Sequence, residues 1–267
     1  MTQKITGFTG KLTGDARGTM SATAHDPASF SHRELQVLHQ DNHTIVVFKP
    51  ARVPVQSDSS GDISLLEVVR QYIAAEYQKP GNVFVGMVQR LDRPVSGLVV
   101  FARTSKGAAR LSEQLRQHRI YKHYLALVHG APSESEGTLR HLLEYREGTA
   151  IAGRHGQGKT AVLHYRVLQH LPDASLLHIR LETGRKHQIR FQLSRIGCPI
   201  LGDLRYGARA PLPDQSIALC AWALSYEHPT SRQPIMVRLP AGLLPQAIQP
   251  LAEILPDPFT KETLHEV

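Results

Sequence analysis

Short runs of β-branched and apolar residues recur along the chain, bounded by Gly, Pro and polar residues. Runs of this length and composition predict β-strands. In chain order the predicted strands are 43–49, 97–102, 121–129, 161–168, 176–182, 217–226 and 234–239. The first ends at Pro50 and the third is closed by Gly130, which are typical strand terminators.

Three other segments carry apolar residues at the spacing of an α-helix. The first follows Ser64, which with Glu67 fits a capping box. The second is predicted over 105–119 with Ser105 as its N-cap. The third is predicted over 186–196, where Ile189, Leu193 and Ile196 are four and three residues apart and Gly197 follows.

Strands and helices mix without a regular β-α-β alternation, which favours an α+β fold over a doubly wound sheet. Residues 131–160 show weak patterning and are predicted to be mainly loop. Residues 1–33 have few large apolar side chains and are predicted to be a flexible tail. The expected organisation is therefore a tail over 1–33, one folded domain over 34–255 and a short tail over 256–267.

The amino-acid composition is that of a globular protein. The chain has 267 residues, of which 41% are hydrophobic and 20% charged, enough to bury a sizeable core. Its two cysteines, Cys198 and Cys220, cannot form a disulfide framework or a four-cysteine zinc site, so free thiols in a reducing cytoplasm are expected. Neither a membrane-length apolar run nor a secretory signal is present in the sequence.

The positive charge is concentrated in two segments. The whole chain has a formal charge of +8, whereas residues 103–124 and 179–209 together carry +10 and the remainder carries −2. Two basic segments on one face would form a groove that follows a phosphate backbone, although either alone is compatible with an ordinary solvated helix face. The charge distribution indicates a polyanionic partner such as RNA.

One motif matches a nucleotide-binding signature by letter only. Residues 153–160 (GRHGQGKT) fit the phosphate-binding loop pattern, which must follow a buried strand and open a helix. Here the preceding stretch is polar and the following AVLHYRV is strand-like. We interpret the segment as a Gly-rich turn before a strand and not as a nucleotidase site.

Three stretches carry candidate chemistry. Asp92 lies in a turn (QRLDRPVSG) before a strand, between Arg90 and Arg93, whose charges would keep a nucleophilic carboxylate ionised. Tyr124 shares a strand face with Ala126 and Val128 and would offer a flat ring to a base and a phenol able to relay a proton. Each residue taken alone also fits a structural role, as a turn cap or as core packing.

The third stretch is ETGRKHQIR, in which Arg185 follows the flexible Gly184. Its guanidinium fork could pair with a carboxylate at two points. His187 has no second His or Cys at ligand spacing, so we interpret it as a hydrogen-bonding or packing group and not as a metal ligand.

Together, QRLDRPVSGLVVFART, YKHYLALVHG and ETGRKHQIRFQLSRIGCPILGDLRYG resemble, in order and spacing, the signature segments of the RluA family of RNA pseudouridine synthases. The opening HTIVVFKPARVPV and the closing CAWALSYEHPTSRQPIMVRLP are also similar to that family, so the resemblance covers about residues 35–239. It implies a mixed, mainly antiparallel sheet with helices and loops around a basic cleft. It also implies isomerisation of uridine in folded RNA without cofactor or metal.

The resemblance assigns roles by position. Asp92 matches the essential Asp of the family, Tyr124 its active-site Tyr, Arg185 the Arg that pairs with the Asp, and Arg90 an Arg linked to flipping the target base. We add Lys122, Lys186 and Arg190 as expected RNA contacts from the two basic segments. Whether Asp92 attacks directly or opens a glycal route is not decided by the sequence.

The chain departs from the family pattern in small ways. Gln89 stands where the family usually has His, and Val95 precedes Ser96 in place of the usual Thr. Only about 33 residues precede the catalytic region, so we expect a member without the N-terminal S4 RNA-binding domain. We expect a cytoplasmic monomer that acts on ribosomal or transfer RNA, with a catalytically silent RNA-binding protein as the main alternative. A glycoside hydrolase would need a second carboxylate beside Asp92, and none stands out.

Overall fold

The computed structural model describes residues 30–78, 81–154 and 157–260. Most of the predicted tails, 1–33 and 256–267, lie outside these ranges. Within them Phe30 is buried and Phe259 packs edge-on to the ring of His123, so the packed domain extends beyond the expected boundaries at both ends.

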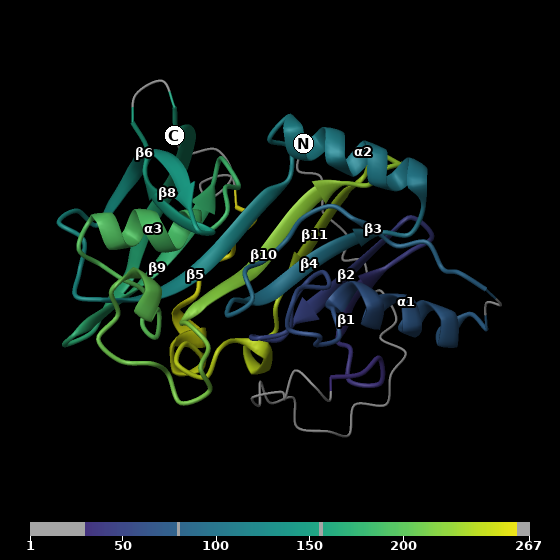
Figure 1. Ribbon diagram of the computed structural model, residues 1–267, viewed down its shortest axis with the longest axis horizontal. Helices are drawn as coiled ribbons and strands as arrows, with labels where there is room; N and C mark the ends of the chain where they lie inside the picture. Colours follow the sequence, from purple (N-terminus) through teal and green to yellow (C-terminus); the bar gives the residue numbers. More distant parts are fainter. Residues whose placement is uncertain (1–29, 79–80, 155–156, 261–267) are drawn as a thin grey trace, which may run out of the picture.

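A single mixed sheet forms the centre of the molecule (Figure 1). Its strand order is β1-β2-β4-β10-β5-β9-β8-β6-β7, with β11 paired to β10 and β3 to β4. Among the strands that the structure describes, only the β10–β4 pair is parallel. The strands are β1 (Val37–Gln40), β2 (Thr44–Lys49), β3 (Gly86–Met87), β4 (Ser96–Ala102), β5 (Tyr121–His129), β6 (Glu136–Arg146), β7 (Thr149–Ala152), β8 (Lys159–His170), β9 (Ala174–Leu181), β10 (Leu219–Glu227) and β11 (Pro234–Arg238). The predicted α+β class with a mainly antiparallel sheet is confirmed.

Three α-helices within the described ranges flank the sheet: α1 (Leu65–Glu76), α2 (Ser105–Arg116) and α3 (Gln188–Arg195). In Figure 1, α1 and α2 lie beside the half of the sheet that holds β1–β4, and α3 lies beside the half that holds β6–β9. Ser64 caps α1 as predicted, because its side chain accepts a hydrogen bond from the Glu67 N–H. The cap of α2 is Thr104 and not Ser105, since the Thr104 hydroxyl accepts from the Gly107 N–H.

The prediction of a loop-rich segment over 131–160 was wrong. This segment contains all of β6 and β7 and the start of β8. Along β6 only Leu143 is fully buried and the other positions alternate between exposed and half-buried. Strands that cover so small a core need few apolar residues, which is why their pattern was weak.

Gly97 allows the two halves of the sheet to join. It has a φ of +129°, and a Cβ at this position would lie 2.4 Å from the carbonyl oxygen of Ala221 on β10. The parallel β4–β10 contact is short and runs through Ser96 and Gly97. A side chain here would therefore push apart the strands directly after the turn that carries Asp92.

The largest apolar cluster fills both sides of the central strands. A second, smaller cluster of Leu143, Ala150, Ala161, Phe191 and Tyr206 lies between α3 and the β6–β8 region. Helix α3 is therefore buried on both sides, and its first six residues are all buried. No helix among the described residues is long and apolar enough to cross a bilayer.

Candidate active site

A cleft of about 1250 Å³ opens over the middle of the sheet. Its walls are the turn before β4 and the turn between β9 and α3, and part of its floor comes from β5. All seven predicted site residues line it: Arg90, Asp92, Lys122, Tyr124, Arg185, Lys186 and Arg190. Its lining holds nine Lys and Arg but only three acids, so the two basic segments do meet on one face.

The turn that carries Asp92 is fastened to the chain after β2. The carbonyl of Arg93 accepts from the Arg52 N–H at 2.7 Å and from the Lys49 ammonium at 3.1 Å. The carbonyl of Asp92 itself accepts from the Val95 N–H at 3.0 Å. The Asp92 side chain is 21% exposed and faces the cleft from this fixed turn.

Lys49 is fully buried beneath this turn. Its ammonium donates to the carbonyls of Pro50 and Val53, both at 2.8 Å, as well as to that of Arg93. Burial lowers the pKa of Lys49 to about 7, although the negative charge of Asp92 acts in the opposite direction. Three carbonyl acceptors match the three N–H donors of an ammonium, so Lys49 holds the turn best when protonated.

The cation beside Asp92 is Arg190. Its Nη1 lies 3.2 Å from Asp92 Oδ2, and only 6% of the Arg190 side chain is exposed. Its other nitrogens, Nε and Nη2, donate to the two oxygens of Asp203 at 2.7 and 2.8 Å. Burial opposes the charge of Arg190, but the hydrogen bonds and charges of the two carboxylates outweigh it and raise the pKa of the guanidinium.

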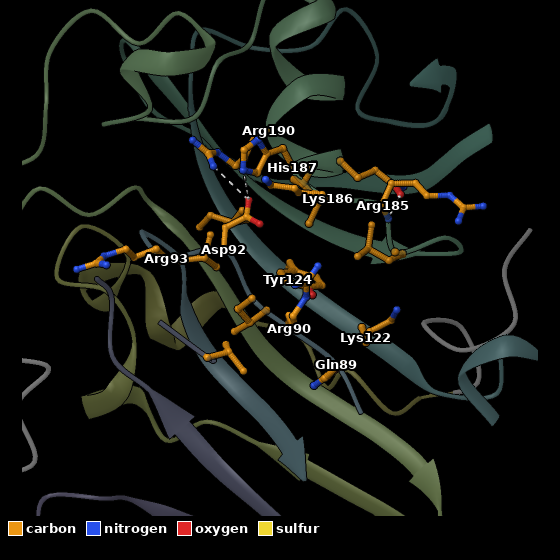
Figure 2. A pocket seen from close by; sticks show the side chains of 18 of the residues that line it. Gln89, Arg90, Asp92, Arg93, Lys122, Tyr124, Arg185, Lys186, His187 and Arg190 are labelled. Atoms are coloured by element: carbon orange, nitrogen blue, oxygen red, sulfur yellow. Dashed lines mark hydrogen bonds and ion pairs between the residues drawn. The ribbon is translucent and has the colours of Figure 1, made fainter. Parts of the chain in front are cut away.

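The predicted salt bridge between Arg185 and Asp92 is therefore wrong. The Arg185 side chain is exposed, and its Nε donates to the Thr160 carbonyl on β8 at 3.1 Å. Figure 2 shows it directed away from Asp92, whereas Arg190 points toward the carboxylate. The reason is position in the helix: Arg185 precedes α3 at the rim of the cleft, while Arg190 lies in its buried first turn.

The expected role of the flanking arginines as partners of Asp92 is also corrected. Arg93 pairs with Asp58 at 3.2 Å and also with Asp62. Arg90 is exposed and its Nη1 lies 3.4 Å from Gln56 Oε1. Neighbours in the sequence point in different directions here, so the charge that faces Asp92 comes from α3, 98 residues away.

Tyr124 lies on β5 between Ile179 of β9 and Ala221 of β10 and is 6% exposed. Burial, reinforced by the charge of Asp92, raises the pKa of its phenol far above the ordinary value. The group is therefore a neutral phenol at any physiological pH. This favours the stacking role of Tyr124 over a role as a proton-accepting phenolate.

The predicted RNA contacts fall into three kinds. Arg90 is exposed at the cleft, as a backbone contact should be. Lys186 is exposed too, and its Nζ would lie 3.3 Å from a Cβ at Gly148 in the β6–β7 turn. The Lys122 ammonium lies against Gly184 on the opposite wall, 3.1 Å from where a Cβ would stand. Arg190 is buried and bonded to two carboxylates, so its assignment as an RNA contact is wrong.

His187 stands at the N-terminus of α3 and contacts Tyr206 in the loop that follows the helix. Its backbone is left-handed, with a φ of 56°, and its Nδ1 lies 2.9 Å from the Tyr206 hydroxyl. That hydroxyl oxygen also accepts from the Ala150 N–H at 2.9 Å, so Tyr206 links the start of α3 to β7. His187 Nε2 lies 3.7 Å from Asp92 Oδ2, and burial lowers the pKa of His187 to about 4. The expected hydrogen-bonding role of His187 is confirmed.

Sequence reasoning missed Lys49, Asp203 and Tyr206 as parts of this site. Lys49 was visible only as the end of an apolar strand, and its burial with no carboxylate bound to it has no local signal. Asp203 and Tyr206 stand in the segment GDLRYG, which was quoted for its resemblance but given no role. Their contacts with Arg190 and His187 arise only when the loop folds against α3.

The structure also bears on the Gly-rich match at 153–160, on metal binding and on the two cysteines. Residue 153 follows β7, and β8 begins at Lys159, so no helix starts after the Gly-rich match at 153–160. The part of the chain that the structure describes holds no cluster of three His, Cys, Asp or Glu side chains placed to bind a metal ion. Both cysteines are free and buried, as expected.

Residues 43–195 match the family model for RNA pseudouridylate synthase. The chain belongs to this family. The resemblance to its RluA branch is confirmed by relatives called "Ribosomal large subunit pseudouridine synthase D". The relative from Nitrosomonas europaea is 36% identical over 220 residues, which is 77% of this chain and 62% of the relative. That from Zymomonas mobilis is 37% identical over 210 residues, which is 74% of this chain and 66% of the relative.

The chain thus spans less than two thirds of the length of each of these two relatives. Among solved structures, "Human RNA Pseudouridylate Synthase Domain Containing 4" superimposes with a TM-score of 0.67 at 22% identity. The match covers 82% of this chain and 92% of that one. It shows that the two share the pseudouridine synthase fold.

Proposed function

We propose that this protein is an RNA pseudouridine synthase that isomerises specific uridines in structured RNA, with Asp92 as the reacting carboxylate. The observation that carries the proposal is the pairing of Asp92 with Arg190 next to the Tyr124 ring in a strongly basic cleft. Membership of the synthase family supports the same reaction. Because two relatives are called ribosomal large subunit synthases, we propose ribosomal RNA as the substrate class.

The reaction conserves all atoms. The N1–C1′ bond of uridine breaks, the uracil rotates in the pocket, a C5–C1′ bond forms, and the proton lost from C5 is balanced by one gained at N1. The target must first leave its stack, at a cost of about a few kcal/mol. Basic side chains such as Lys122 and Lys186 bind the backbone, and Arg90 occupies the space that the base leaves.

Within the pocket, Tyr124 stacks on the uracil, and its phenol stays neutral and can donate a hydrogen bond without giving up its proton. Asp92 acts as nucleophile, or as the base that opens a glycal route. Arg190 binds the Asp92 carboxylate and directs it into the cleft. In this scheme Arg185 supports RNA binding at the cleft rim and has no contact with the reacting carboxylate.

We further propose that the residues between the two expected tails form the catalytic domain, acting as a cytoplasmic monomer without an obligatory protein partner. The main alternative is a catalytically silent RNA-binding protein on the same fold. The retained Asp92, Tyr124 and Arg190 favour the enzyme, since a binding module does not need a buried Arg–carboxylate pair at the floor of its groove.

The experiment is to map pseudouridines in cellular RNA from strains with and without the gene, and from a strain that expresses Asp92→Asn. If the protein is an enzyme, at least one uridine that is modified in the wild-type strain will be unmodified in the deletion strain and in the Asp92→Asn strain. A map that is identical in all three strains, with RNA still bound to the purified protein, would support the silent binding protein.

A further inference from the structure

Asp203 lies at the base of the site without being part of its surface. Its side chain is 1% exposed and it is absent from the lining of the cleft. Both of its oxygens accept hydrogen bonds from Arg190, at 2.7 Å from Nε and 2.8 Å from Nη2. The remaining nitrogen, Nη1, is the one that reaches Asp92. One guanidinium therefore bridges a buried carboxylate and the reacting one.

We propose that Asp203 is a positioning residue for the isomerisation, which holds the Arg190 guanidinium in the orientation that presents Nη1 to Asp92. The inference rests on the proposed function of the cleft. It assigns Asp203 no contact with RNA, and its effect passes entirely through Arg190.

Geometry shows why Arg190 alone would not suffice. An Arg side chain has several rotatable bonds, and one contact of 3.2 Å with Asp92 fixes neither its plane nor its rotation. Two parallel bonds to one carboxylate fix both. The Tyr206 ring packs against the guanidinium with its centroid 5.0 Å from Cζ, so a second residue of the same loop limits the remaining motion.

The loop itself is rigid where it carries Asp203. The Asp203 N–H donates to the Ile200 carbonyl at 3.1 Å, and the Asp203 carbonyl accepts from Tyr206 and Ala208 at 3.0 Å each. The preceding Gly202 has a φ of +86°, and a Cβ there would lie 2.7 Å from the Ser216 carbonyl oxygen. The carboxylate is thus delivered to Arg190 by a backbone that has little freedom.

The charges give Asp203 a second effect on Asp92. Two carboxylates share one guanidinium, so part of the attraction that Arg190 would exert on Asp92 is compensated by Asp203. Asp92 is oriented but keeps more of its negative charge available for attack.

The test is single-turnover pseudouridine formation by Asp203→Asn on an RNA that the wild-type protein modifies. Asn keeps the shape but loses the charge and one acceptor, so the rate constant should fall by about 10- to 100-fold, the scale of a misplaced reacting group. RNA affinity should change by less than about threefold, so the loss falls on the rate constant of the bound complex and not on binding. Asp41→Asn is the control, because Asp41 accepts four hydrogen bonds in the β1–β2 hairpin outside the cleft. It should lower stability without changing the rate of the folded protein.

A double-mutant cycle separates positioning from general packing. In an Arg190→Met background, Asp203→Asn should cost no further rate, because the group through which Asp203 acts is gone. A rate for Asp203→Asn within twofold of wild type would overturn the inference. So would a loss that persists undiminished in the Arg190→Met background.

If Asp203→Asn does not fold, the Arg190 Nε–H signal in NMR spectra of the Asp92→Asn protein gives the answer. It should stay protected from exchange, because the bonds to Asp203 remain, and rapid exchange would refute the positioning role. A wild-type protein that forms no pseudouridine would instead refute the proposed function. An active wild type with an equally active Asp203→Asn would refute only the inference about Asp203.

Discussion

Lys122 should make RNA binding sensitive to pH in a range where most lysines are fully charged. It lies on β5 two residues before Tyr124, hence on the same face of the strand, and its ammonium faces the cleft. Among the residues that the structure describes, the ammonium of Lys122 has no hydrogen-bond or ion-pair partner. Burial lowers the pKa of Lys122 to about 8. A desolvated cation without a counterion is stabilised by an anion, and the anion that this cleft should receive is an RNA phosphate.

The size of the change in RNA affinity follows from the pKa of Lys122. The ammonium is mostly present below pH 8 and mostly lost above it, so the contribution of Lys122 to binding falls as pH rises. With a pKa of about 8, the charged fraction is about 0.97 at pH 6.5 and about 0.24 at pH 8.5. If only the ammonium binds the phosphate, RNA affinity falls about fourfold over this range, or about 0.8 kcal/mol.

The assay is fluorescence anisotropy with labelled substrate RNA at constant ionic strength, in an Asp92→Asn background that prevents turnover. The pH range ends at 8.5, before uracil begins to lose its N3 proton. Lys122→Arg keeps a permanent charge at this position and leaves every other titrating group in place. The RNA affinity of this variant should therefore fall less steeply with pH than that of the wild type. Lys106→Met, at an exposed position on α2 outside the cleft, should weaken binding slightly and keep the slope.

The comparison of wild type with Lys122→Arg decides the matter, because the histidines titrate equally in both. Equal slopes in the two proteins would show that Lys122 does not supply a titrating phosphate contact. A steeper fall for wild type, together with proton uptake on binding near pH 8, is the expected result.

Four further outcomes follow from the site. Asp92→Asn should abolish pseudouridine formation, measured by release of the C5 tritium of labelled uridine, while RNA affinity stays nearly unchanged; activity within tenfold of wild type would exclude Asp92 as the reacting group. Arg190→Lys should lower turnover by about 100-fold because the fork that joins two carboxylates is lost, whereas Arg185→Lys at the exposed rim should lower it by less than threefold; the reverse order would restore the original assignment. Gly97→Ala should destabilise the protein by at least about 2 kcal/mol in denaturant unfolding, since its Cβ would meet the Ala221 backbone, and a change below about 0.5 kcal/mol would contradict that contact. Added ATP should change neither wild-type nor Lys159→Ala turnover, and specific ATP binding lost in that variant would revive the nucleotidase interpretation.

Much of the fold could be predicted because it depends on local pattern. Strand β5 begins and ends where the sequence predicted, and the Ser64 cap of α1 was read from a single motif. The β6–β7 hairpin was missed because it covers only a small cluster and does not need a strong apolar alternation. The apolar pattern of a strand or helix is stronger in the sequence when that element covers a larger part of the core.

The residues that carry the proposed chemistry divide in the same way. Asp92 and Tyr124 were candidates from the sequence because they stand in a Pro- and Gly-bearing turn and on a strand face, and the family resemblance gave them their expected roles. Both line the cleft, so their placement there was predictable from the segments that hold them.

The partner of Asp92 was decided only by the tertiary structure. Arg185 and Arg190 stand five residues apart in one motif, and either has the fork and the charge to pair with a carboxylate. The choice depends on which side of α3 meets the turn before β4. The spacing of Ile189 and Leu193 predicts an apolar face and a polar, solvated one, but the structure buries both sides, so the pattern does not show that Arg190 faces Asp92. Asp203 and Lys49 belong to the site for the same reason: their contacts join segments distant in sequence, and no local pattern encodes such a contact.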